Sequence, residues 1–143
     1  MLTNRTMPHD VLIPVLGYPD VAEAVTWLCG AFGFTPRWQA GRHRAQVGVG
    51  PSAAIALVED APLAMSRNAD HVMVRVDDVD AHHQRAVDYG ATVTAEPTDH
   101  FFGERQYTVL DHIRRTWVFT QSIADVAPQE WGATVPELPD LPA

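Results

Sequence analysis

Lysine is absent from this chain, and cysteine occurs only once, at Cys29. All ten basic residues are therefore arginine, and the 18 acidic residues outweigh them to give a net charge of −8. An acidic chain without a basic stripe is a poor match for phosphates, which argues against a nucleic-acid partner. One cysteine cannot form an internal disulfide, so we expect a reducing, cytoplasmic location.

Long apolar runs are also missing. No stretch approaches the length of a membrane span, and residues 1–10 hold no apolar core of signal-peptide length, so no membrane partner is expected. A phosphate-binding loop is not indicated, because Gly48–Gly50 ends a strand pattern instead of opening a helix. With 46% hydrophobic and 20% charged residues over 143 positions, the composition is typical of a single globular domain.

One pattern occurs twice. Ile13 and His71 each begin a short apolar strand that runs into an Asp-Val helix start, about three helical turns and a glycine stop. Asp20 followed by Glu23 resembles a capping box, and Gly33 ends that helix. The repeat predicts a duplicated module, in which equivalent positions of the two copies can supply one site.

The remaining elements follow from alternation and turn residues. The helices are expected from Val21 to Phe32 and over Val79–Tyr89. Strands are expected around Val11–Leu16, Phe34–Gln39, His43–Val49 and Ser52–Val58 in the first half, and around His71–Val76, Ala91–Glu96, Gln106–Leu110 and Thr116–Gln121 in the second.

These elements divide the chain. Residues 1–122 are expected to form one domain, with module one at about 10–59 and module two at about 70–122, joined by the segment 59–70. The proline-rich and acidic residues 123–143 are expected to form an irregular arm held in place by Trp131.

The ordered set of motifs resembles the vicinal oxygen chelate superfamily, which includes glyoxalase I, extradiol dioxygenases and bleomycin-resistance proteins. The motifs that carry the resemblance are Ile13–Asp20 leading to Ala31–Phe34, His71–Asp78, and Gly103–Tyr107 leading to Asp111 and Trp117–Thr120. The resemblance implies an α+β fold of two tandem βαβββ modules, a curved mixed sheet around a groove, and a homodimer. The stretch Asp111–Arg114 replaces the family's usual Asp-Pro-x-Gly turn.

The resemblance also implies where a metal would bind. In metal-using members the first and last strand of each module supply the ligands. His71 matches one such position, but Ile13 and Phe119 occupy two others, and the fourth falls near Ala56 or Leu57. Since a metal of this kind needs roughly three or four ligands, we expect no metal, no other cofactor and no catalytic residue.

Strand alternation predicts the groove lining. His71, Met73 and Arg75 would share one face of their strand, with the helix on the other side. The full set of expected ligand-binding residues is Trp38, His71, Met73, Arg75, Phe101, Phe102, Tyr107, Trp117, Phe119 and Gln121. The competing interpretation places the aromatic residues of this set in the core.

Three functions remain open at this point. The first is a protein similar to bleomycin-resistance proteins, which binds a small aromatic or amphipathic molecule without metal catalysis. The second is a metal-dependent lyase or isomerase of glyoxalase type, in which His71, Glu59 and a residue of a partner chain bind the metal. The third is a dimeric assembly module with no ligand. We favour the first, with an enzyme as the less favoured alternative.

Overall fold

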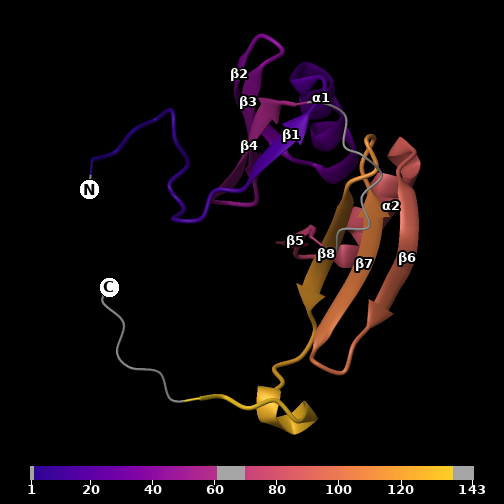
Figure 1. Ribbon diagram of the computed structural model, residues 1–143. Coiled ribbons are helices and arrows are strands. Elements are labelled where there is room, and N and C mark those ends of the chain that lie inside the picture. The colour runs from indigo at the N-terminus through magenta and orange to yellow at the C-terminus, as the bar shows by residue number, and fades with distance from the viewer. Residues whose placement is uncertain (1, 61–69, 137–143) are drawn as a thin grey trace.

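The computed structural model describes residues 2–60 and 70–136 (Figure 1). Residues 61–69 of the predicted connection and residues 137–143 of the predicted arm lie outside the described residues. Module one consists of β1 (Val15–Tyr18), α1 (Val21–Phe32), β2 (Thr35–Ala40), β3 (Arg44–Val49) and β4 (Ala53–Glu59).

Module two repeats this order, as the sequence predicted. It consists of β5 (Val72–Arg75), α2 (Val79–Tyr89), β6 (Thr92–Asp99), β7 (Glu104–Leu110) and β8 (Thr116–Ser122). A short 3₁₀ helix, η1 (Pro128–Trp131), follows in the C-terminal arm.

The strands form two separate four-stranded sheets, with the orders β1-β4-β3-β2 and β5-β8-β7-β6. In each sheet the first strand pairs in parallel with the last strand of its module, and the other pairings are antiparallel. The α+β class and the tandem βαβββ modules are therefore confirmed. The strands are divided between two mixed sheets, and neither sheet closes into a barrel.

Both helices begin and end at the predicted residues. The Asp20 carboxylate accepts a hydrogen bond from the backbone N–H of Glu23 at 3.1 Å, and Asp78 does the same from Ala81 at 3.0 Å. Gly33 and Gly90 end the helices with φ angles of 75° and 99°, a left-handed conformation that glycine adopts without a steric penalty. Local capping chemistry is therefore sufficient to set these four boundaries.

The first strand is the clearest error in the prediction. Val11 and Leu12 were expected in a buried strand, but they are 99% and 82% exposed. The observed β1 starts at Val15, where pairing with β4 begins. Pro14 has no N–H to donate and contributes only its carbonyl oxygen, which accepts from Ala56 at 3.0 Å. The apolar residues before it are therefore not held in the sheet.

One hydrophobic core joins the two modules. Helices α1 and α2 pack against each other, and each covers one face of its own sheet. At the end of α1, the Phe32 ring lies 5.3 Å from Trp117 and 4.8 Å from Phe119 of β8, between ring centroids. Each sheet thus has an inner face, which packs on the helices and this core, and an open face on its other side.

A buried carboxylate also connects the modules. Asp111, which follows β7, is 4% exposed and accepts a hydrogen bond from the Tyr18 hydroxyl of β1 at 2.8 Å and from the Trp117 indole N–H at 3.1 Å. Its other oxygen accepts the backbone N–H groups of Ile113 and Arg115. The Arg115 guanidinium lies 4.7 Å from the Tyr18 ring centroid and donates to the Gly17 carbonyl, which places a positive charge beside the buried group.

The C-terminal arm is attached to the turn between β6 and β7. The Gly103 carbonyl accepts the backbone N–H of Ile123 at 2.8 Å, and the Trp131 ring packs edge-on against Phe101 at 5.7 Å. Figure 1 shows η1 beside this turn at the lower end of the second sheet. Trp131 thus contacts this turn, and its predicted role in holding the arm stays a prediction.

The turn between β7 and β8 contains a strained residue. Arg114 has a φ of 69°, and it is the one described residue other than glycine with a positive φ. Left-handed backbone costs a residue with a Cβ about 1–2 kcal/mol. The turn Asp111–Arg114, which replaces the usual Asp-Pro-x-Gly turn, therefore keeps a left-handed backbone at its last residue, where glycine would be better suited.

We predict that Arg114→Gly stabilises the protein by about 0.5–1 kcal/mol, because relief of this strain outweighs the added freedom of the unfolded chain. Urea denaturation measures the change. Arg114→Ala is the control, since it removes the charge but keeps the Cβ. An equal gain in both variants would mean that the charge, and not the backbone, is responsible.

Candidate functional site

The open face of the second sheet holds part of the predicted groove lining. Along β5, Val74 packs in the core, whereas Met73 is 54% exposed and Arg75 is exposed. In the sheet, Arg75 pairs with Thr120 of β8, which pairs in turn with Gln106 of β7. Met73 and Arg75 thus share the face of β5 that is turned away from the core, and their place in a groove lining stays a prediction.

A chain of hydrogen bonds crosses this open face. The Gln106 amide donates to the Thr120 hydroxyl at 3.1 Å, and that hydroxyl donates to the Glu104 carboxylate at 2.7 Å. Hydrogen bonds from the Ser122 and Thr120 hydroxyls, with a smaller contribution from the charge of Arg75, lower the pKa of Glu104. Glu104 is therefore a carboxylate at neutral pH, and the face presents one anion, one cation and a fixed amide.

Four of the expected groove residues lie on the inner face instead. Trp117, Phe119 and Tyr107 are at most 1% exposed, and the Phe119 ring packs against His82 of α2 with centroids 4.0 Å apart. Gln121 accepts the backbone N–H of Val79 at 2.9 Å and so supports the start of α2. The face predicted for these side chains is wrong, and the alternative of a core role for the aromatic residues holds for Trp117, Phe119 and Tyr107.

The register between β5 and β8 explains this error. The parallel pairing sets Val72 beside Trp117 and Val74 beside Phe119. Because paired residues share a face, the side that buries Val74 also buries Phe119. The open-face position of β8 beside Met73 is therefore Val118, a residue that alternation assigned to the other side.

Trp38, Phe101 and Phe102 lie away from this row. Trp38 pairs with Gln46 on the open face of the first sheet, where its indole N–H donates to the Thr6 carbonyl at 3.0 Å. Phe101 and Phe102 lie in the turn between β6 and β7, and Phe101 is 72% exposed. The predicted set is thus divided among two open faces, one turn and the core.

The residues at the metal-ligand positions do not fit a metal ion. His71 lies immediately before β5 and is exposed. Across residues 2–60 and 70–136, no three His, Cys, Asp or Glu side chains are grouped as metal ligands would be. Ile13 occupies the equivalent position of module one, and on β8 either candidate, Phe119 or Val118, has an apolar side chain that cannot bind a metal.

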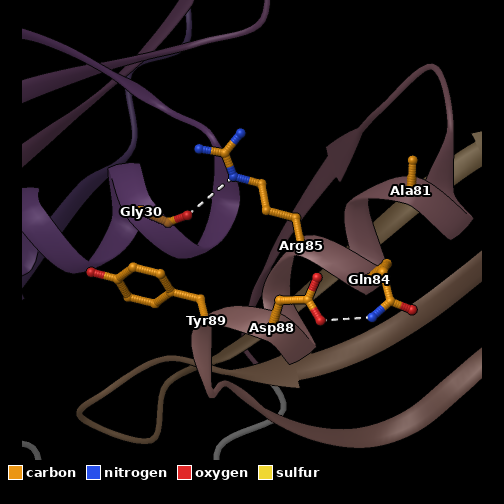
Figure 2. A pocket seen from close by; sticks show the side chains of 6 residues that line it. All are labelled: Gly30, Ala81, Gln84, Arg85, Asp88 and Tyr89. Atoms are coloured by element: carbon orange, nitrogen blue, oxygen red, sulfur yellow. Dashed lines mark hydrogen bonds between the residues drawn. The ribbon is translucent and has the colours of Figure 1, made fainter.

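A shallow depression of about 540 Å³ between α1 and α2 was not predicted (Figure 2). Its polar groups are engaged with each other: Arg85 donates to the Gly30 carbonyl at 3.1 Å, and Gln84 donates to Asp88 at 2.8 Å. The Tyr89 ring lies against α1 at Gly30, where a Cβ would come within 2.4 Å of it. The contacts of Arg85 and Tyr89 with Gly30 join the two helices, and no pattern in the sequence indicated them.

Taken together, the elements and their pairing define a protein built from two tandem βαβββ modules. The chain belongs to the Glyoxalase/Bleomycin resistance protein/Dioxygenase superfamily, whose sequence profile matches residues 10–119. No curated protein matches the chain. No helix of the described residues is long and apolar enough to cross a membrane.

Several solved structures have the same fold. TioX from Micromonospora sp. ML1 is 26% identical, with a TM-score of 0.66 over 82% of this chain and 100% of that one. A glyoxalase/bleomycin resistance protein from Streptomyces sp. CB03234 is 24% identical, with a TM-score of 0.60 over 76% and 97%. A glyoxalase/bleomycin resistance protein/dioxygenase from Alicyclobacillus acidocaldarius is 14% identical, with a TM-score of 0.67 over 82% and 95%.

We predict losses of stability of very different size for alanine substitutions of two apolar residues on the two faces of the second sheet. Phe119→Ala is expected to lower the free energy of unfolding by about 3–5 kcal/mol, because it leaves a cavity in the core. Met73→Ala is expected to cost less than about 1 kcal/mol, since Met73 is half exposed. Chemical denaturation of both variants checks the assignment, which comparable losses would contradict.

Proposed function

We propose that the chain binds a small amphipathic molecule against the open face of β5, β8 and β7, without catalysis by a bound metal. The observation that supports this most is the row of Arg75, Thr120 and Gln106 beside the exposed Met73, on a sheet face that no helix covers. Polar groups fixed by their neighbours next to an exposed apolar side chain are typical of ligand sites.

The chemistry of this face narrows the ligand. The Arg75 guanidinium offers a fork of donors for a carboxylate or another acceptor group. Glu104 and the Gln106 carbonyl oxygen offer acceptors, and the flexible Met73 thioether adapts to apolar bodies of different shape. Stacking on Trp117 or Phe119 is not available here, because both rings are buried on the inner face. We therefore propose a ligand with an apolar body and both donor and acceptor groups.

A flat sheet face needs a second wall to enclose a ligand, and we propose that a second copy of the chain supplies it. The open faces of the two sheets are directed away from the common core, so one copy does not close a groove by itself. Strands β1 and β5 each pair on one side only, which leaves sheet edges for another strand to meet. In a two-fold dimer the first sheet, with Trp38, would face the partner's second sheet.

The metal-dependent alternative has less support. It requires His71 to act together with Glu59 and a residue of a partner chain, yet Glu59 pairs with His43 at the end of the first sheet. Nothing in the described part of the chain favours the assembly-only alternative over ligand binding.

We predict that a compound from a panel of metabolites and antibiotics raises the melting temperature, and that Arg75→Ala abolishes the increase while leaving the melting temperature of the free protein nearly unchanged. The reason is that Arg75 is exposed and contributes little to the core. Thermal-shift assays measure both quantities. Arg42→Ala, another exposed arginine outside this face, is the control and should keep the increase.

A sharp loss of stability in Arg75→Ala with unchanged affinity would disprove the assignment of this face. Metal analysis of protein purified without chelators tests the metal-dependent alternative. Stoichiometric zinc, nickel, manganese or iron that disappears in His71→Ala would favour that alternative over ours.

We also predict a dimer in solution. Light scattering at micromolar concentration should give about 32 kDa, twice the chain mass of 15.8 kDa. A mass near that of one chain under these conditions would leave the open faces unpaired and would contradict the proposed second wall.

A further inference from the structure

His82 of α2 connects three elements across the contact between the modules. Its Nε2 lies 2.9 Å from the Phe32 carbonyl oxygen at the end of α1, and its Nδ1 lies 2.5 Å from the Tyr107 hydroxyl of β7. Its ring packs against that of Phe119 of β8, tilted by 32° and with centroids 4.0 Å apart. One imidazole therefore contacts the helix of the other module and two strands of its own sheet.

These partners fix one protonation state. A carbonyl oxygen only accepts hydrogen bonds, so Nε2 must carry the proton that points at Phe32. Nδ1 then accepts from the Tyr107 hydroxyl, and the ring is neutral. A second proton on Nδ1 would displace the hydroxyl hydrogen of Tyr107, and no other hydrogen-bond partner of that hydroxyl is found in the described residues.

The surroundings also disfavour a charged ring. Burial has the largest effect and lowers the pKa of His82. The hydrogen bond to the Phe32 carbonyl acts in the opposite direction but is outweighed, and the nearby positive charge of Arg85 adds to the lowering. The groups that face the ring are the Phe32 ring and carbonyl of α1, Tyr107 of β7 and Phe119 of β8, and none of them is an anion. No carboxylate among the described residues offsets the cost of a proton here.

His112 also lies at the contact between the modules, but it is a weaker candidate for a group whose protonation would disrupt that contact. It stacks on Tyr18 and lies 5.3 Å from Trp27, between ring centroids. Burial lowers its pKa, but the carboxylates of Asp111, Glu23 and Asp20 act in the opposite direction. Carboxylates would partly compensate a proton on His112, whereas on His82 the opposing effect comes from the neutral carbonyl of Phe32 and not from an anion.

We propose that His82 makes the contact between the two modules sensitive to acid, so that protonation of its ring separates α2 from the C-terminal end of α1. The direction follows from linkage. A solvated histidine takes up a proton near pH 6.5, and the buried His82 does so only at a lower pH. Above about pH 6.5 the contact keeps its full strength. Below it, the open state takes up the proton first, and the opening equilibrium rises by up to about tenfold per pH unit.

Other contacts limit the opening to this region. Arg85 donates to the Cys29 and Gly30 carbonyls of α1, and arginine stays charged throughout the range (Figure 2). The bonds of Asp111 to Tyr18 and Trp117 lie at a different part of the contact. Acid is therefore expected to loosen the end of α1 against α2 before the whole fold is lost.

Hydrogen–deuterium exchange of the full chain at pH 7.5 and 5.5, corrected for the intrinsic effect of pH, tests this. We expect protection at pH 5.5 to fall, by up to about tenfold, in peptides from the end of α1 and from α2. His82→Gln should keep its protection, because its amide can donate to Phe32 and accept from Tyr107 but does not titrate. His43→Gln, which removes an exposed histidine of the first sheet, should behave like the natural chain.

The proposal would be overturned if His82→Gln lost as much protection at pH 5.5 as the natural chain does. It would also be overturned if the loss of protection were uniform along the chain. If His82→Gln does not fold, NMR titration of the natural chain replaces it. A His82 midpoint below pH 6.5, with chemical-shift changes in the Phe32 region over the same range, supports the proposal. A midpoint at or above 6.5 contradicts it. The contact does not involve the open sheet face, so failure here leaves the ligand proposal intact.

Discussion

The buried carboxylate of Asp111 is the constraint on which the arrangement of the modules depends. A carboxylate that is 4% exposed is costly unless each of its oxygens has partners, and Asp111 has four hydrogen-bond donors. One donor, the Tyr18 hydroxyl, comes from the other module and is itself buried, and burial raises the pKa of Tyr18 far above its usual value. The modules must therefore stay in contact to keep both groups satisfied, with the charge of Arg115 beside them.

This contact determines which surfaces remain for function. Because the helices and the large aromatic side chains fill the space between the modules, each sheet leaves its other face open. The same alternation that turns Phe119 to the core turns Val118 and Thr120 to that face of the second sheet, where both are nevertheless buried, at 8% and 4% exposed. The core side of β8 and the face proposed for binding are therefore opposite each other, and a substitution on one face need not affect the other.

The sequence predicts the parts of this fold that depend on local chemistry. Asp20 and Asp78 bond to backbone N–H groups three residues away, so both helix starts are readable from the chain alone. Alternation also separates the two faces of each strand correctly. It does not say which face of β8 joins the inner face of β5, because that depends on a register between distant strands. The size of Trp117, Phe119 and Tyr107 was the available signal that this face was the core. The bond between Tyr18 and Asp111, 93 residues apart, has no local signal.

A double-mutant cycle between Tyr18→Phe and Asp111→Ala tests most directly whether this buried bond holds the modules together. Free energies of unfolding from urea denaturation of the four proteins give the coupling between the two side chains. If the bond acts across the module contact as described, the two losses are not additive, and the coupling is about 1 kcal/mol or more. Losses that add to within about 0.3 kcal/mol would contradict this account, since each side chain would then stabilise its own module independently.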